Sequence, residues 1–481
     1  GVRLLNEAVR LCPDSVVCWK ELARAYRHVG RFDRAEEAAR RVIELQPDDT
    51  EHKIALAGIL AMQNRIEEAE SIYRDVIRQT PENTKVRGRL AHLLEAVHRL
   101  DDAKELAEEQ LALDANNPHA VSVLAKCLRR QGKLEEAFKL CDEAVKCDPR
   151  ARRFVDLDYE FARILDEMNR PDAAYERVEL ASQLQKQLYS GAIGEHSCTA
   201  QAARAMRERL ESSWVEQWSD LPNDGVGEPL AVLCGFPRSG TTLLERSIAA
   251  HRDVTSFEEK PTFSCLQARL SQTADGYPDG IATMTEVQRG ELRQTYRALL
   301  SLYSSELGAA CLLDKLPLHT INIPLIYRIF PRAKLLVALR HPCDVILSCY
   351  MQHFSLNGAM INFNSLQDAA RLYVDTMNIW IRSRELWPLQ ALEVRYEDSV
   401  NDFESQLRNV LSFLNLPWCG EILQAKSRTS QQHRVNTPSY HQIARPIYKT
   451  SVDRWRRYAK YFQPLEKDLR PLVERFGYHW D

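Results

Sequence analysis

The feature that most constrains this chain is a repeat of 34 residues in its N-terminal third. Stacked helical hairpins have periods of this length, and each hairpin buries its apolar face only against its neighbours. A residue that ends the second helix of each hairpin recurs at this interval, at Pro13, Pro47, Pro81, Ala115 and Pro149. The repeat predicts a stack of helical hairpins over residues 1–185.

Small residues recur inside each hairpin, where they let two helices pack closely. A leucine–alanine pair stands at Leu22, Leu56, Leu90 and Leu124, a second alanine at Ala35, Ala69, Ala103 and Ala137, and a turn residue at Gly30, Asn64, His98 and Gly132. A shifted copy follows with Ala162, Asn169 and Ala174. The pattern resembles the tetratricopeptide repeat (TPR) family, which implies a concave α-solenoid surface that binds a peptide or protein. The alternative is that the array only spaces or dimerises the rest of the chain.

The overall composition excludes several classes of partner. Lys and Arg number 64 against 67 Asp and Glu, so the net charge of −3 indicates neither nucleic acid nor an anionic membrane as a partner. No stretch approaches the roughly 18 to 20 apolar residues of a membrane span. The 12 cysteines lack CxxC pairs and zinc-ligand spacing. This predicts no metal site and favours a reducing cytoplasm.

The pattern changes after the repeats. Residues 186–227 lose the period, stay compatible with helix as far as Trp218, and end in a linker rich in Gly, Pro and Asn. From residue 228 to 481, four short apolar runs alternate with amphipathic stretches, and helices are expected after the first, third and fourth runs. The expected strands are 230–234, 310–313, 333–339 and 391–394. The predicted fold is therefore multidomain, with an α-solenoid followed by a P-loop-like parallel α/β domain.

The turn after the first expected strand reads as an anion site. A strand, a glycine-rich turn and a helix N-terminus together point several backbone N–H groups at one place. The spacing Gly235-x4-Gly240 matches a phosphate-binding loop, but Thr241 stands where NTP-binding loops carry lysine. This departure argues against ATP and GTP, although a nucleotide kinase stays an alternative. The predicted anion-binding residues are Arg238, Ser239, Gly240, Thr241 and Thr242.

Three further polar motifs follow the other expected strands, where ligands of parallel sheets bind. They are Asp314-Lys315, Arg340-His341-Pro342 and Arg395-Tyr396-Glu397. With the loop at 237–244, they make residues 229–480 resemble sulfotransferases, and protein-tyrosine sulfotransferases in particular. The resemblance implies that the loop holds the 5′-phosphosulfate of 3′-phosphoadenosine 5′-phosphosulfate (PAPS). It also implies that Arg340 and Ser348 grip the 3′-phosphate. Ser348 is expected near the start of the helix that includes residues 345–350.

The same resemblance implies the catalytic residues. Glu259 aligns with the catalytic base, Lys315 with the lysine that steadies the transition state, and Ser439 with a further hydrogen-bond donor to the reacting centre. Glu258 is the neighbouring carboxylate that could be confused with Glu259. Sulfuryl transfer needs no magnesium clamp, but it needs a base near the donor and a fixed cation for the charge that develops. Additional nucleotide contacts are implied for Tyr396, Arg445 and Arg454.

Structural roles are the alternatives for these residues. Glu259 could pair with Lys260 or Arg246, Ser348 could cap its helix, and Tyr396 could be a core residue. Arg454 could pack on Trp455 as a cation–π pair, and Arg445 could form a structural ion pair. The histidines, His341 among them, are expected to be structural.

Three positions depart from the protein-tyrosine sulfotransferase pattern. Gln352 and Thr262 stand where arginines are expected, and Ser256 stands where the luminal enzymes have a disulfide cysteine. The predicted function is a PAPS-dependent sulfotransferase that acts on an acceptor hydroxyl, with tyrosine, a sugar, a lipid headgroup and a small phenol all open. The alternative from a different class is a non-catalytic TPR scaffold.

Overall fold

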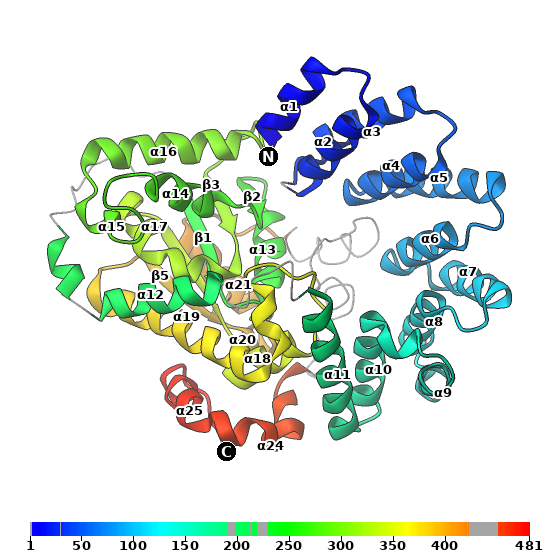
Figure 1. Cartoon of the computed structure of the whole chain (residues 1–481). Coiled ribbons are helices and arrows are strands. Elements are labelled where there is room, and N and C mark those ends of the chain that lie inside the picture. Colours follow the sequence, from blue (N-terminus) through cyan, green and yellow to red (C-terminus); the bar gives the residue numbers. More distant parts are fainter. Residues whose placement is uncertain are drawn as a thin grey trace. The chain divides into compact units, whose positions relative to one another are not determined.

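The computed structural model describes residues 2–28, 30–189, 198–211, 213–218, 229–420, 422 and 451–481 (Figure 1). The chain divides into two compact units, one from Gly1 to Ala181 and one that takes up most of the chain from Ser182 to Asp481. The predicted boundaries at 185 and 227 stay predictions.

The first unit is a series of antiparallel helical hairpins, as the repeat predicts. Each hairpin follows the last along the chain (Figure 1). The helices are α1 (Val2–Leu11), α2 (Val16–His28), α3 (Phe32–Leu45), α4 (Thr50–Met62), α5 (Ile66–Gln79), α6 (Thr84–Ala96), α7 (Leu100–Leu113), α8 (Pro118–Arg130), α9 (Leu134–Cys147), α10 (Val155–Glu167) and α11 (Pro171–Tyr189).

The repeated small residues have the predicted structural role. The second-helix alanines are fully buried, and the turn residues adopt the left-handed backbone that ends one helix and lets the next begin. Glycine, asparagine and histidine tolerate this conformation better than most residues. The φ values are 73° at Gly30, 65° at Asn64, 64° at His98, 79° at Gly132 and 57° at Asn169.

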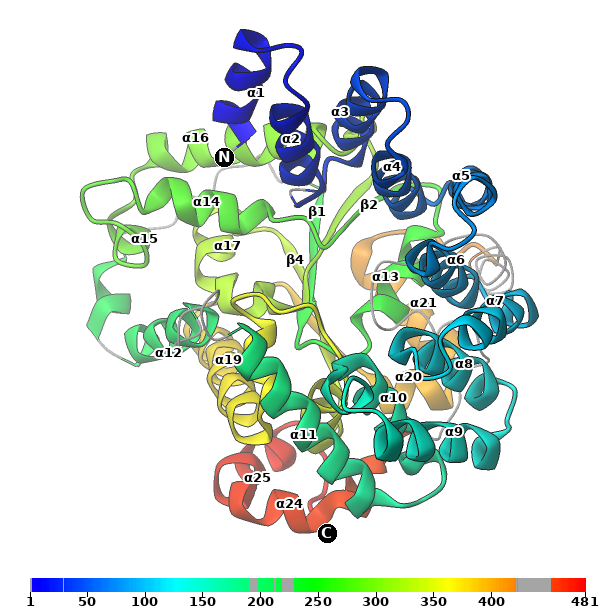
Figure 2. The ribbon, with the colours of Figure 1, turned by 45° about the vertical axis from the view of Figure 1, so that its right-hand side comes forward.

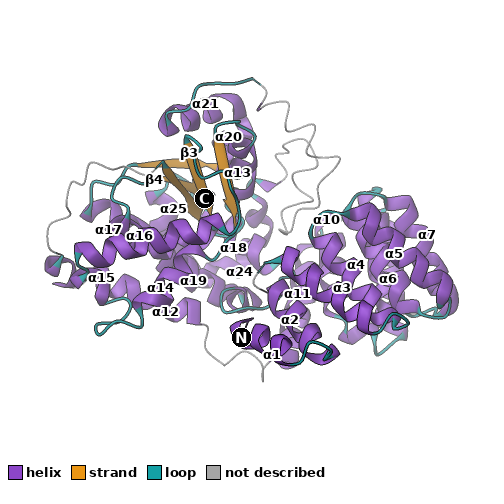
Figure 3. Ribbon diagram, turned by 90° about the horizontal axis from the view of Figure 1, so that it is seen from above, coloured by secondary structure: helices purple, strands orange, loops and turns teal. Residues whose placement is uncertain are grey.

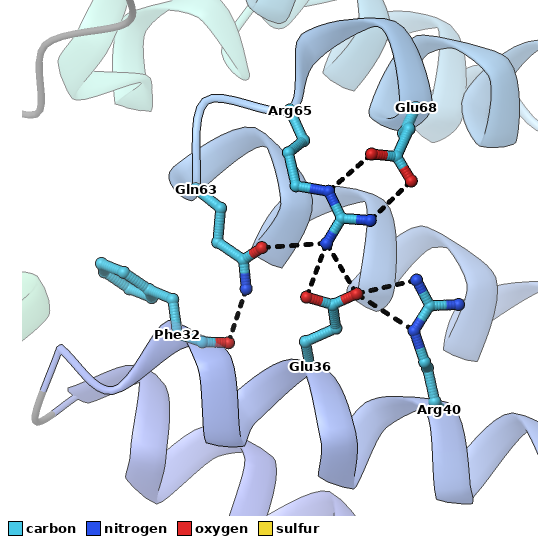
Figure 4. Close-up of polar contacts among 6 residues, drawn as sticks. All are labelled: Phe32, Glu36, Arg40, Gln63, Arg65 and Glu68. Carbon is cyan, nitrogen blue, oxygen red and sulfur yellow. Dashed lines mark hydrogen bonds and ion pairs between the residues drawn. The ribbon is translucent and has the colours of Figure 1, made fainter.

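Ion pairs link neighbouring repeats at the residue after the turn. Arg65 lies 2.7 Å from Glu36 of the preceding repeat and 2.5 Å from Glu68 of its own helix (Figure 4). Burial acts to raise the pKa of Glu36, but hydrogen bonds from Arg40 and Arg65 outweigh it and hold the pKa below its usual value. These contacts connect α3 of one hairpin to the residue that precedes α5 of the next.

The second unit is built on a parallel sheet of five strands in the order β2-β3-β1-β4-β5. The strands are β1 (Leu230–Gly235), β2 (Val254–Glu258), β3 (Cys311–Lys315), β4 (Lys334–Leu339) and β5 (Ala391–Arg395). The predicted parallel α/β class is confirmed. The sequence reading missed β2, because its residues Val254–Glu258 contain no continuous apolar run.

Helices cover both faces of the sheet (Figures 2 and 3). On one face, α13 (Thr241–Ala249) and α21 (Phe403–Leu414) pack against β1, β3, β4 and β5 in one apolar cluster. The opposite face is covered by helices that include α14 (Thr262–Leu270), α17 (Ile323–Ile329) and α19 (Leu366–Leu386) (Figure 2). This burial on both faces explains why the central strands are continuous apolar runs.

The remaining α-helices in the described part of this unit include the two that directly follow β4 and β5. These remaining helices are α12 (Cys198–Leu210), α15 (Gly280–Thr283), α16 (Glu286–Ser301), α18 (Pro342–Tyr350), α20 (Tyr396–Asn401), α24 (Ala459–Phe462) and α25 (Glu466–Arg475). Across the described ranges, no helix is both long enough and apolar enough to cross a membrane.

Candidate active site

The loop between β1 and α13 is held in a shape that only particular residues allow. Gly240 has a φ of 99°, and a Cβ atom there would lie 2.9 Å from the Tyr396 ring. Thr320 fixes the other end of the loop, since its hydroxyl accepts from Gly235 N at 2.9 Å and donates to Gly235 O at 2.7 Å. Ser239 donates to Phe236 O at 2.7 Å. The N-terminus of α13 is therefore presented by a rigid turn, as an anion site requires.

The sheet brings Arg238 of this loop to the residues predicted to bind the 3′-phosphate. Arg238 Nε donates to Ser348 Oγ at 3.1 Å, and Arg340 Nη1 donates to the carbonyl oxygen of Arg238 at 3.2 Å. Residues 238 and 348 are far apart in the sequence and meet because β1 and β4 are neighbours in the sheet. Arg238 itself has a φ of 71°, a left-handed conformation that costs an arginine about 1–2 kcal/mol.

Arg340 is a buried cation that interacts electrostatically with the buried Asp344 carboxylate: burial raises the pKa of Asp344, and the Arg340 charge opposes this rise. Within the described part of the chain it forms no ion pair, and its partners are two backbone carbonyls and the Tyr396 ring, 4.9 Å from its guanidinium carbon. Its Nε atom is buried without a hydrogen-bond partner. A buried arginine in this state fits a site for an anion such as a phosphate group.

Ser348 does not lie where the sequence reading placed it. We expected it near the start of its helix, but α18 begins at Pro342, immediately after β4, so Ser348 falls in the last turn. The proline at the first helical position and the His341 side chain, which accepts from Cys343 N at 3.3 Å, explain the early start. Ser348 does not cap the helix; its hydroxyl accepts from Arg238.

A second polar cluster forms where β2 and β3 end. Lys315 is the last residue of β3 and is fully buried, and its Nζ atom lies 3.2 Å from Glu258 Oε1 and 3.0 Å from Glu259 Oε1. The two carboxylate side chains keep 35% and 41% of their surface exposed. The buried cation is thus paired with two carboxylates that solvent or a substrate can reach. Neither Lys260 nor Arg246 is the partner of Glu259; Lys260 lies over the Tyr303 ring.

Glu259 is held in a strained backbone conformation. Its φ is 51°, and its N–H donates to Lys315 O at 2.7 Å. Arg238 and Glu259 are the only residues with positive φ in the described ranges that are not glycine, asparagine, aspartate or histidine. Both belong to the predicted site, so the strain is concentrated there.

Burial and neighbouring charge shift the titration of groups beside this cluster. Burial raises the pKa of Glu245, the nearby charge of Glu258 raises it further, and Ser256 donates to this carboxylate at 2.6 Å. Burial also lowers the pKa of Lys260, against the opposing effect of Glu258 and Glu259. The cluster therefore holds three carboxylates around one buried lysine.

The C-terminal segment closes on the Arg340 side of the site. Arg340 Nη2 donates to Ser451 O at 2.5 Å, and Asp344 accepts from the N–H groups of Asp453 and Trp455 at 2.8 Å each. Arg454 lies 3.0 Å from Met351 Sδ through Nη2, and the guanidinium of Arg456 lies over the Trp455 ring.

Ser439 and Arg445 lie outside the described residues, so their predicted roles stay predictions. In the described ranges, no group of His, Cys, Asp and Glu side chains is arranged to hold a metal ion. The sequence reading missed Thr320, Glu245 and the contacts of Asp314. Each of these polar residues stands in an apolar stretch of the sequence. That placement was the only sequence signal that could have identified them.

Comparisons with known proteins agree with this geometry. A profile described as the sulfotransferase family matches residues 229–419, and tetratricopeptide repeat profiles match residues 20–84, 60–127 and 94–157. The chain carries TPR repeats followed by a sulfotransferase-family domain.

Individual relatives are distant. An uncharacterized protein of Aquifex aeolicus is 29% identical over 250 residues, which is 50% of this chain but only 32% of that protein. Protein-tyrosine sulfotransferase 1 of Danio rerio is 24% identical over 269 residues, or 52% of this chain and 72% of the relative. The crystal structure of YrrB, titled as a TPR protein with an unusual peptide-binding site, matches 38% of this chain and 94% of YrrB at 17% identity. The TM-score of this match is 0.27.

Proposed function

We propose that the sulfotransferase-family domain transfers a sulfuryl group from PAPS to an acceptor hydroxyl, with Glu259 as the base. The observation that carries the proposal is the buried Lys315, whose Nζ atom lies 3.0 Å from Glu259 Oε1 at the same sheet edge as the Arg238 loop. A base, a fixed cation and an anion-binding loop are the three groups that this reaction needs.

The donor would be held at both of its anionic ends. The loop from Arg238 to Thr242, at the start of α13, would bind the 5′-phosphosulfate through backbone N–H groups. Arg340 and Ser348 would bind the 3′-phosphate. The contact between Arg238 and Ser348, at 3.1 Å, supports this assignment, because one donor molecule must reach both regions. We assign supporting roles to Tyr396, which packs on Arg340, and to Arg454.

The chemistry follows from the pairing of Lys315 and Glu259. Glu259 accepts the proton of the acceptor hydroxyl, the oxygen attacks sulfur in line, and the bond from sulfur to the 5′-phosphate oxygen breaks to release adenosine 3′,5′-bisphosphate. When Glu259 takes the proton its charge is lost, so the Lys315 ammonium loses one of its two ion pairs. It can then interact more strongly with the charge that develops on the departing oxygen.

The substitution Glu259→Gln tests the assignment, with Glu258→Gln as the matched control. Both variants remove one carboxylate charge beside Lys315. We expect only Glu259→Gln to abolish sulfuryl transfer, while calorimetry shows nearly unchanged affinity for adenosine 3′,5′-bisphosphate. Equal activity of Glu259→Gln and the unmodified chain would remove Glu259 from this role, and failure of the unmodified chain to bind the bisphosphate would reject the donor.

We further propose a hydroxyl on a peptide or protein as the acceptor. This rests on the similarity to protein-tyrosine sulfotransferases and on the TPR array, which would hold the partner. Labelled sulfate transfer to tyrosyl peptides and to glycans, assayed side by side, distinguishes the acceptor classes. Transfer to glycans alone would contradict the peptide assignment without affecting the donor.

A further inference from the structure

The short segment that carries Glu259 makes side-chain contacts with two residues of β3 that point to opposite faces of the sheet. Neighbouring residues of a strand point to opposite faces of the sheet. Lys315 contacts Glu258 and Glu259, whereas Asp314 turns to the other face and accepts a hydrogen bond from Thr262 Oγ at 2.7 Å. The segment from Glu258 to Thr262 therefore bridges two adjacent residues of one strand.

The Asp314 carboxylate is unusual for its surroundings. It is fully buried, and it accepts from the hydroxyls of Thr262 and Tyr296 at 2.7 Å each and contacts His319 Nε2 at 3.3 Å. No lysine or arginine of the described ranges forms an ion pair with it. Burying a carboxylate costs free energy even when it is hydrogen-bonded, so such a group adds little to the stability of the fold. Its main effect is to fix the orientation of the groups that donate to it.

The orientation that this carboxylate specifies is that of the segment behind the candidate base. Glu259 has left-handed backbone, and a residue in that state persists only where its surroundings hold it. Its N–H is held by Lys315 O, its carboxylate by Lys315 Nζ, and the chain three residues later by the bond from Thr262 to Asp314. Pro261, between them, fixes one backbone angle.

We infer that Asp314 and Thr262 are positioning residues that keep Glu259 in its strained, Lys315-facing conformation. The inference rests on the proposed function for its catalytic consequence, but not for its structural one. Thr262 therefore acts through the backbone of the base-bearing segment and does not contact the acceptor itself. Its side chain is 1% exposed.

The test compares Thr262→Val with Thr262→Ser, which keeps the hydroxyl, and with Thr376→Val as a matched control. Thr376 of α19 is also fully buried, but its hydroxyl has no hydrogen-bond partner among the described residues. A displacement of the base by about 1 Å can cost about 100-fold in rate. We expect Thr262→Val to lower kcat by about 10- to 100-fold with the affinity for adenosine 3′,5′-bisphosphate unchanged. Thr262→Ser should recover most of the activity, and Thr376→Val should match the unmodified chain.

Amide hydrogen exchange supplies a readout that needs no substrate. In Thr262→Val, exchange should rise in peptides that cover residues 258–263 and stay unchanged in β4. Unchanged exchange there, or a parallel loss of kcat and of bisphosphate affinity, would overturn the inference. If the unmodified chain transfers no sulfate from PAPS, the proposed function fails, and the exchange result still decides whether Thr262 and Asp314 hold the segment.

Discussion

The TPR array and the sulfotransferase-family domain use left-handed backbone in different ways. In the array it occurs at repeated turns, and the non-glycine residues there are Asn64, His98 and Asn169, which tolerate it. In the domain, Arg238 and Glu259 adopt it, although neither residue type favours it. The array therefore follows local preferences throughout, whereas the domain overrides them where polar groups must be aimed at one place.

The two regions also differ in how their buried charged side chains are paired. In the array, Asp158 is buried and faces Arg177 at 3.4 Å on the next helix of the same hairpin. In the domain, the buried Lys315 is paired with carboxylates that remain partly exposed. The first arrangement links two helices, and the second leaves one side of the pair open for chemistry.

The largest expected effect is the loss of activity when the Lys315 ion pairs with Glu258 and Glu259 are removed. We predict that Lys315→Met lowers kcat by about 100- to 1000-fold, the usual consequence of removing one group that stabilises transition-state charge. Lys334→Met, at the amino end of β4, is the control and should change kcat less than about twofold. Steady-state sulfate transfer measures both variants. An active Lys315→Met variant would show that the ion pairs of Lys315 have only a structural role, like the pair of Asp158 and Arg177 in the array.

The next effect concerns the buried charge of the array. Burial raises the pKa of Asp158 from 3.8 to about 6, against the opposing effect of Arg177. The folded state therefore holds this proton more tightly than the unfolded state. Stability is lost as pH rises from 3.8 through about 6, by up to about 3 kcal/mol.

Asp158→Asn removes this loss. We predict that it raises the unfolding temperature of the full chain at pH 7.5 and leaves it nearly unchanged at pH 4, as measured by scanning calorimetry. Glu143→Gln, on the exposed surface of α9, should have no effect at either pH. A lower unfolding temperature at pH 7.5 in Asp158→Asn would show that the ion pair stabilises the hairpin.

The smallest effect compares two glycines with left-handed backbone. Gly132→Ala should cost about 1–2 kcal/mol of stability, because a Cβ atom there meets nothing within 4 Å and only the backbone is strained. Gly240→Ala carries the same strain and also crowds the Tyr396 ring, so it should cost more and weaken bisphosphate binding. Denaturant unfolding and calorimetry measure the two effects, and equal costs would show that the loop is no more tightly built than a repeat turn.

The sequence predicted most of the array and only part of the site. Repeats are local, so the positions of Ala35, Gly132 and their equivalents follow from one hairpin. In the domain, the apolar runs predicted β1, β3, β4 and the edge strand β5, but β2 was missed because its residues contain no continuous apolar run. The strand expected at residues 310–313 corresponds to β3, which continues through Asp314 and Lys315.

The contacts of the site could not be read from spacing. Glu259 was expected to face Lys260 or Arg246 if it formed a structural pair, and it faces Lys315, which the neighbouring strand supplies. The bonds of Asp314 to Thr262 and Tyr296 join segments that are distant in sequence. Only the strand order decides which of these segments meet.

The alternation of Asp314 and Lys315 along β3 makes the pairing of this strand sensitive to error. A slip of β3 by one residue against β1 and β2 would exchange the two faces. An anion would then stand beside Glu258 and Glu259, and an ammonium group would lie beside Tyr296 and His319 in place of the Asp314 carboxylate. The candidate site therefore forms only when β1, β2 and β3 are correctly aligned. A chain with β3 misaligned would be inactive as well as unstable.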